Sequence, residues 1–287
     1  MTLVQYDPFD QEKIAINEQI ITEFYRSEGY PGVRVKSRVE VVESRLESEG
    51  KKFRVVFEME EKPRVYLSDI YISGTKYYSE LDIKRFILSS EIDCVAWANQ
   101  SGLFREEMIN QDLSLITQHY LKNGFINVFI EKPDVTLIHN PDYSRVDVRL
   151  NITEGDQYYS GKISVSGDIL GKKEKLLEGL LLEQGEIYNP FLQNRDRSGI
   201  SEIYYERGYA FVRVVPETKV HKETKTVDVT YRILKGEKAY IGRLEIAGNK
   251  ETRDHVIRRE FELQEEELFN GKKLRLSQEN LNRLGFF

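Results

Sequence analysis

Cysteine is almost absent from this chain, since Cys94 is the single cysteine among 287 residues. One cysteine excludes an internal disulfide framework and a metal cluster built from several thiolates. No basic residue flanks it in the segment EIDCVAW. We therefore expect a small buried apolar side chain there and not a reactive thiol.

Long apolar runs and basic clusters are also missing. No stretch approaches the ~20 apolar residues of a membrane-spanning helix, and the opening MTLVQYDPFD lacks the charged start and apolar middle of a signal peptide. The net charge is −6 with lysine and arginine scattered, which argues against a nucleic-acid partner. With 40% hydrophobic residues, 31% charged residues and only 7 prolines, the composition is that of a folded protein.

Groups that could carry catalysis or hold a metal do not cluster in the sequence. An enzyme needs a nucleophile, a base and an orienting group, or metal ligands at workable spacing. The histidines fall in different segments without a paired ligand, and they are His119, His139, His221 and His255. We expect neither an enzyme nor a metal or cofactor site, and a hydrolase would need an active cleft of which the sequence gives no sign.

A ten-residue pattern occurs three times in the chain. It reads ITEFYRSEGY at 21–30, ITQHYLKNGF at 116–125 and ISEIYYERGY at 200–209, with a weaker copy in the final ENLNRLGFF, where Leu281 replaces the tyrosine. Apolar residues at spacings of three and four before the pattern predict a helix packed on one side. The glycine after each copy predicts the end of that helix, in a backbone conformation with positive φ.

Further signals recur around each copy. A short alternating strand ends at Gly74, Gly167 and Gly248, which lie 93 and 81 residues apart, and a helix-forming run follows each of them. The unit closes with a strand in which apolar residues alternate with polar ones, predicting one buried face. These alternating sets are Phe53, Val55, Phe57, Met59; Val146, Val148, Leu150, Ile152; and Val227, Val229, Tyr231, Ile233.

Proline predicts the position of the remaining strand. The strand before the closing one runs into Pro133 or Pro216, and proline lacks the N–H that a central strand needs, so this strand should lie at the sheet edge. The unit is strand, helix, helix, strand, strand, an α+β fold with a three-stranded sheet and two helices on one face. The predicted units are 1–67 (second helix and closing strands only), 68–159, 160–240 and 241–287 (closing strands missing). Because the first and last are incomplete, we expect a piece of a longer polypeptide.

The chain resembles the POTRA domains of the outer-membrane protein assembly factors of the BamA family. The residues that carry the resemblance are the order of elements, the helix ending in Tyr-x-x-x-Gly-aromatic, and the closing strands that lead to NITEGDQYY (151–159) and ILKGEKAY (233–240). The last stretch, with Gly248-Asn249, Arg258-Arg259-Glu260 and LNRLGFF, resembles the final POTRA before the membrane barrel. By this likeness the pieces correspond to the later part of a second POTRA, a third, a fourth and most of a fifth.

The resemblance implies a periplasmic scaffold, the soluble part of an outer-membrane protein, with a membrane β-barrel following in the parent protein. Its expected partners are unfolded outer-membrane proteins and accessory lipoproteins. An extended peptide can add to an open sheet edge with little regard for its own sequence, which suits a carrier of many clients. The expected edge-strand residues are Ile126, Val128, Ile130, Phe211, Arg213 and Val214.

Two further regions follow from the same reading. The resemblance implies that Arg259 and Glu260 contact a partner lipoprotein. The segment SSEIDCVAWANQSGLF is longer than its counterpart in the next unit, and we expect a loop between helices with Trp97 packed against the core. The alternative within transport is a POTRA array of another outer-membrane translocase, TamA-like or of a two-partner secretion transporter.

Overall fold

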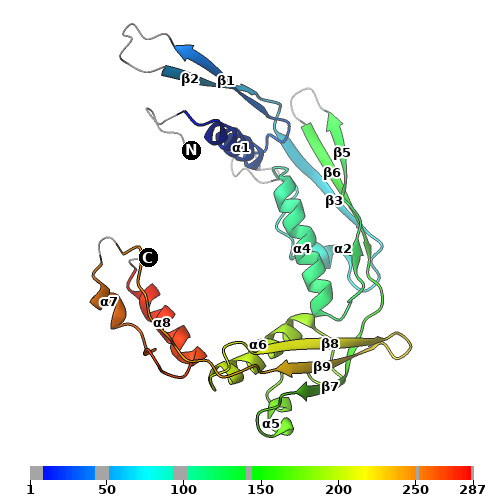
Figure 1. Cartoon of the computed structure of the whole chain (residues 1–287). Coiled ribbons are helices and arrows are strands. Elements are labelled where there is room, and N and C mark those ends of the chain that lie inside the picture. Colours follow the sequence, from blue (N-terminus) through cyan, green and yellow to red (C-terminus); the bar gives the residue numbers. More distant parts are fainter. Residues whose placement is uncertain (1–8, 43–51, 93–101, 140–143, 250–251, 286–287) are drawn as a thin grey trace. The chain divides into compact units, whose positions relative to one another are not determined.

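A computed structural model describes residues 9–42, 52–92, 102–139, 144–249 and 252–285. Cys94 and Trp97 lie outside these residues. The chain divides into two compact units, one made of residues 1–119 and 127–155 and the other of residues 120–126 and 156–287. Figure 1 colours both units along the sequence, and each is described by itself below.

The first unit opens with one helix and a hairpin. Helix α1 (Gln11–Ser27) begins at Asp10, whose side chain accepts hydrogen bonds from two backbone N–H groups of the first turn. Strands β1 (Arg34–Val42) and β2 (Lys52–Glu60) pair antiparallel in a two-stranded sheet. The predicted buried face of β2 is wrong at its ends, because Phe53 is 42% and Met59 48% exposed. In the described residues no further strand pairs with β2, so little apolar surface covers it.

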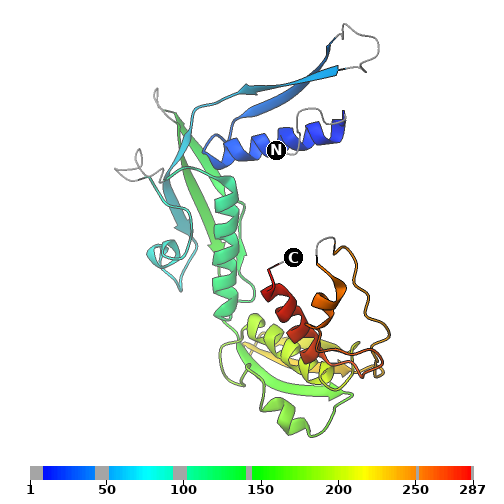
Figure 2. The same cartoon turned by 90° about the vertical axis from the view of Figure 1, so that its left-hand side faces the viewer.

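The rest of this unit is a complete repeat. Its elements are β3 (Val65–Ser73), α2 (Glu80–Lys84), α4 (Glu106–Lys122), β4 (Phe129–Ile130), β5 (Asp134–His139) and β6 (Ser144–Thr153). Strand β6 is central, with β3 parallel on one side and β4 and β5 antiparallel on the other. Its alternating apolar residues are at most 3% exposed, as predicted. Figure 2 shows α4 lying along one face of this sheet.

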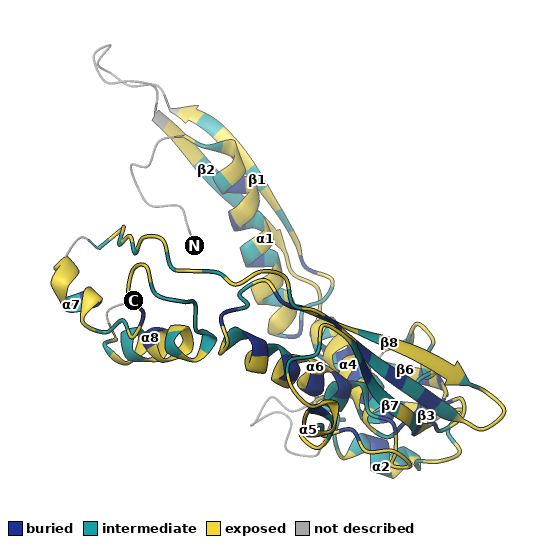
Figure 3. Cartoon of the chain, turned by 60° about the horizontal axis from the view of Figure 1, so that its bottom comes forward, coloured by how far each residue is buried: buried dark blue, intermediate teal, exposed yellow. Residues whose placement is uncertain are grey.

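The second unit contains the next complete repeat. It consists of β7 (Tyr159–Gly167), α5 (Lys173–Leu177), α6 (Pro190–Tyr205), β8 (Arg213–His221) and β9 (Thr226–Leu234), with sheet order β7–β9–β8. Leu176 of α5 and Tyr204 of α6 share one core with the alternating residues of β9. The predicted α+β repeat, with both helices on one face, is therefore confirmed. In Figure 3 strand β8 is coloured mainly as exposed, and Val214 is its one buried residue.

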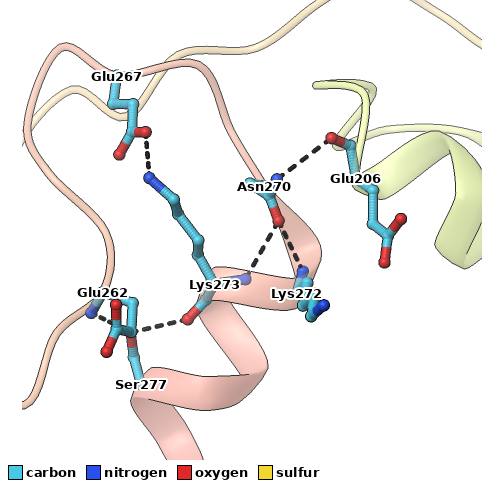
Figure 4. Close-up of polar contacts among 7 residues, drawn as sticks. All are labelled: Glu206, Glu262, Glu267, Asn270, Lys272, Lys273 and Ser277. Atoms are coloured by element: carbon cyan, nitrogen blue, oxygen red, sulfur yellow. Dashed lines mark hydrogen bonds and ion pairs between the residues drawn. The ribbon is translucent and has the colours of Figure 1, made fainter.

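The second unit ends with α7 (Asp254–Arg258) and α8 (Gly271–Arg283). The strand predicted before Gly248 is absent, and residues 241–249 form no strand. A strand needs a hydrogen-bonded neighbour, and within the described residues nothing equivalent to β6 or β9 pairs with this segment. Polar side chains hold α8 in place, as Figure 4 shows: the Asn270 amide oxygen accepts two N–H groups of the first turn, while its amide nitrogen donates to the Glu206 carbonyl, 3.2 Å away.

The weak fourth copy of the motif is out of register with the others by about one helical turn. Gly208 follows the N-cap residue Asn189 by 19 positions, whereas Gly285 follows Asn270 by 15. Four residues correspond to about one turn of α-helix. The glycine of the last repeat therefore ends a shorter helix, and its position along the helix is that of Tyr204 and not of Gly208.

The repeated glycine both ends a helix and joins it to the next repeat. Gly208 has φ +95°, and its carbonyl accepts the N–H of Ala239, 2.9 Å away. A Cβ built on it would lie 2.7 Å from the side chain of Leu268. The equivalent carbonyl bonds join Gly29 to Val65 and Gly124 to Tyr158. The motif therefore recurs because each junction between repeats is built in the same way.

Candidate functional site

The outer edge of each complete sheet is the first candidate for binding. Among the described residues, strands β4 and β5 in one repeat and β8 in the other each pair on one side only, with β6 or β9. This agrees with the edge position predicted from the prolines. Pro133 separates β4 from β5, and the register with β6 shifts by one residue between them. Pro216 lies inside β8 and removes one of its N–H groups, so β5 offers the uninterrupted backbone edge.

Apolar side chains beside the β5 edge remain partly open to solvent. Val135 and Leu137 lie opposite Val148 and Val146, so they are on the face that packs against the helices. Yet Val135 is 43% and Leu137 47% exposed. The neighbouring Ile138, on the opposite face, is 44% exposed. A strand added to β5 with its own apolar residues on the helix side would cover the first two and leave Ile138 untouched.

The predicted edge residues of the first complete repeat begin too early. Ile126 and Val128 precede β4, and only Ile130 of the three lies in a strand. Ile126 packs against the core of the second unit. The chain needs several residues to leave the helix after Gly124 before it can reach the sheet, and the apolar pattern of the sequence does not register that turn.

The second set is displaced in the same way. Phe211 precedes β8, and Arg213 and Val214 are its first two residues. Phe211 is 75% exposed, while Val214 is 7% exposed and belongs to the core. Among the three, Arg213 is the exposed residue on the strand itself. Whether any of these residues contacts a peptide stays a prediction.

Arg259 and Glu260 follow directly after α7. The Arg259 Nε atom lies 3.0 Å from the Glu260 carboxylate, and the Arg259 side chain is 64% exposed while that of Glu260 is 22% exposed. The amide of Asn280 on α8 donates to the Glu260 carbonyl at 3.4 Å. The pair is thus an exposed cation held beside a half-buried carboxylate on one surface of the last repeat.

The opposite edge, formed by the first strand of each repeat, is partly closed by a loop, which the sequence reasoning missed. The N–H of Ser160 donates to the Glu186 carbonyl, and the N–H of Gly185 donates to the Ser160 carbonyl, both at 2.8 Å. Leu67 makes the same two bonds with Gly102 and Ile92. A repeated tyrosine could have located this edge, since Tyr66, Tyr159 and Tyr240 each precede their strand-ending glycine by eight residues.

Metal-ligating side chains do not gather in the described parts of the chain. Within those residues no group of three or more histidine, cysteine, aspartate and glutamate side chains could hold a metal ion. No described helix has the length and apolar character to cross a bilayer. The described surface offers strand edges and exposed apolar side chains.

The fold and its edges define a class, a tandem array of small α+β repeats that present open strands. A family model named POTRA, described as surface antigen variable number repeat, matches residues 1–62, 65–155, 158–236 and 239–287. The chain therefore belongs to the POTRA family. Strands β3 and β7 begin at Val65 and Tyr159, whereas the predicted units begin at residues 68 and 160.

Curated relatives are outer-membrane protein assembly factors. The chain is 31% identical over 280 residues to the outer membrane protein assembly factor BamA of Nitratidesulfovibrio vulgaris, covering 96% of this chain and 34% of the relative. It is 25% identical over 283 residues to a putative outer membrane protein assembly factor of Treponema pallidum, covering 98% and 32%. The chain thus spans about a third of the length of these relatives.

A solved structure shares the fold. Haemophilus influenzae BamA POTRA3-5 superposes with a TM-score of 0.64 at 24% identity, covering 78% of this chain and 87% of that one. At this identity the likeness speaks for the fold alone.

Proposed function

We propose that the chain is a periplasmic scaffold in the assembly of outer-membrane β-barrel proteins. It would hold unfolded client segments and partner lipoproteins. The support is the 31% identity over nearly the whole chain to a protein named for that role. The relatives named above are all called assembly factors, and no observation favours the array of another translocase. The open edges give the scaffold a way to bind without catalysis.

Strand addition at β5 is the central part of this proposal, extending from Ile130 in β4 through residues 134–139. Unpaired main-chain groups would supply the binding and exposed Val135 and Leu137 would supply the preference. A client strand of a membrane barrel alternates apolar and polar residues. Its apolar side chains would continue the helix-facing surface of the sheet. Arg213 and Val214 begin the corresponding, proline-interrupted edge of β8.

A charge introduced beside the edge tests this reading. Leu137→Lys places an ammonium group where the apolar face of a client strand should lie, and we expect loss of binding to an unfolded barrel-strand peptide with alternating residues. Ile138→Lys is the matched control, because the two side chains are neighbours with 47% and 44% exposure but lie on opposite faces. Peptide affinity would be measured by fluorescence anisotropy, with thermal melting confirming that both variants fold.

Equal affinity for the two variants would reject strand addition at β5 with this orientation. Loss of binding in Ile138→Lys alone would place the client on the other face of the sheet.

For Arg259 and Glu260 we propose contact with a partner lipoprotein, supported by the exposure of the Arg259 side chain. Arg259→Glu should then abolish co-purification of that lipoprotein with the full-length protein and leave peptide binding at β5 unchanged.

A further inference from the structure

In two repeats, the segment before the repeated glycine carries a built-in side-chain partner for one peptide group. In β3, the Ile70 N–H donates to the Glu91 carboxylate at 2.9 Å, and the Lys84 ammonium lies 2.7 Å from the same carboxylate. Burial tends to raise the pKa of Glu91, but the hydrogen bonds from Lys84 and from the Ile70 N–H outweigh it and hold the pKa below its usual value. The outward N–H of this edge is thus occupied by a side chain.

The last repeat has a related arrangement, in which the basic side chain also binds the backbone. The Leu244 N–H donates to the Glu265 carboxylate at 3.0 Å, and the Leu244 carbonyl accepts from the Arg258 guanidinium at 3.0 Å. Arg258 and Glu265 are 3.8 Å apart, so an acid and a base hold both polar groups of one residue. Ile70 and Leu244 occupy equivalent positions, four residues before Gly74 and Gly248. We call this arrangement the acid–base clamp.

The complete repeat of the second unit, which runs from β7 to β9, lacks the acid–base clamp. Ile163 is the equivalent strand residue, four positions before Gly167. The Lys162 N–H donates toward β9, to the Asp228 carboxylate, so the next residue along the strand, Ile163, faces away from β9. The acid is replaced by Gln184, which directly precedes the residue whose N–H bonds the strand, as Glu91 and Glu265 do.

The base is also replaced, because the helix α5 ends in Leu177 where α2 ends in Lys84. Within the described residues no side chain accepts the Ile163 N–H. An outward-facing peptide group is therefore left open on an edge that the sister repeats close with charged side chains.

A pocket of about 420 Å³ occupies the position of the missing clamp. Its walls combine apolar and acidic side chains, namely Ile163, Leu177, Glu178, Leu180, Leu182, Glu183 and Gln184. The carboxylates of Glu178 and Glu183 are exposed, and neither forms an ion pair in the part of the chain that the structure describes. The pocket thus combines the free N–H of Ile163, the side chains of three leucines, and the two exposed carboxylates of Glu178 and Glu183.

We propose that this pocket and the β7 edge at Ile163 form a docking site for an extended peptide segment of a partner protein, in which an apolar side chain stands beside lysine or arginine. The Ile163 main chain would pair with the segment, the leucines would take its apolar side chain, and Glu178 and Glu183 would attract its cation. The segment must be short, because the loop at Gly185 and Glu186 already pairs with Ser160. The site lies on the sheet edge opposite β8 and does not depend on the strand addition proposed at β5.

The test uses the whole chain with two capped probe peptides, one of alternating valine and lysine and one of alternating valine and glutamate. Amide NMR shifts should move at Ile163 and Gln184 with the first peptide and stay unchanged with the second. The exposed substitutions Glu178→Gln and Glu183→Gln together should weaken binding of the first peptide roughly fivefold, the effect of two exposed ion pairs. Because both side chains are exposed, the two substitutions should leave the fold unchanged.

A second variant rebuilds the acid–base clamp. Leu177→Lys with Gln184→Glu leaves the net charge unchanged and should occupy the Ile163 N–H, so binding of the valine–lysine peptide should be lost while the circular dichroism spectrum is retained. Shifts confined to residues 134–139 or 213–221 would overturn the proposal, as would equal binding of both peptides. Concentration-dependent self-association that the clamp variant abolishes would make a second copy of the chain the occupant, and would also overturn it.

Discussion

Alanine at two glycines of the junctions between repeats, Gly124 and Gly208, and at Gly185 outside those junctions should separate backbone strain from steric overlap. Gly185, Gly208 and Gly124 have similar positive φ values of +90°, +95° and +84°. A Cβ at Gly185 meets nothing within 4 Å, so Gly185→Ala incurs only the left-handed backbone penalty, about 1–2 kcal/mol. At Gly208 the Cβ would lie 2.7 Å from a leucine side chain that can shift, which raises the expected cost to about 2–3 kcal/mol.

Gly124→Ala should be the most damaging of the three. Its Cβ would lie 2.5 Å from the carbonyl oxygen of Tyr158, and that backbone atom cannot move without breaking the joint. We expect a loss of about 3–4 kcal/mol, the sum of backbone strain and overpacking. Because a chain of several repeats need not unfold in one step, hydrogen exchange of the β7 and β9 amides is the appropriate local measure. A cost at Gly124 equal to or below that at Gly185 would refute the joint as described.

Two further predictions concern stability. The pKa of Glu91 is lowered on folding. Its contribution to the free energy of unfolding is therefore full above the unfolded carboxyl pKa of about 4.3, and it disappears as pH falls through the lower folded value. The chemical shift of the Ile70 amide should titrate with a midpoint below about pH 4.3, and a midpoint above that pH would contradict the clamp. The separately folded unit predicted at 160–240 omits Tyr158, which is 2% exposed. A fragment of 156–240 should accordingly be more stable than 160–240 by about 3–5 kcal/mol in urea unfolding, and equal stability would exclude Tyr158 from the core.

The central parts of each repeat were predictable because local periodicity and burial coincide there. Strand β9 alternates in sequence and is buried in the structure, and the helix that ends at Gly124 carries one apolar stripe. Proline gave the edge position of β8, since a missing N–H is a local property with a consequence for pairing. These features depend on residues within a few positions of one another.

The features that were missed depend on contacts between distant residues. Residues 241–249 have a strand-like pattern but form no strand, because strand formation is decided by a neighbour and not by the segment. The start of β4 was misplaced because the turn after Gly124 is shaped by Tyr158, 34 positions further on. The difference between Glu91 and Gln184 becomes meaningful only when both are seen beside the same rung of their strands.

Leu67 of β3 forms backbone hydrogen bonds to two residues that are far apart in the sequence, Ile92 and Gly102. Its N–H donates to the Gly102 carbonyl and its carbonyl accepts the Ile92 N–H, so two residues ten positions apart in the sequence bond to the same residue of β3. In the next repeat the corresponding partners, Gly185 and Glu186, are consecutive. Extra residues at this point lengthen a closed loop at a cost that grows only slowly with its length. A reporter or an epitope inserted between Gly185 and Glu186 should therefore leave the strands intact.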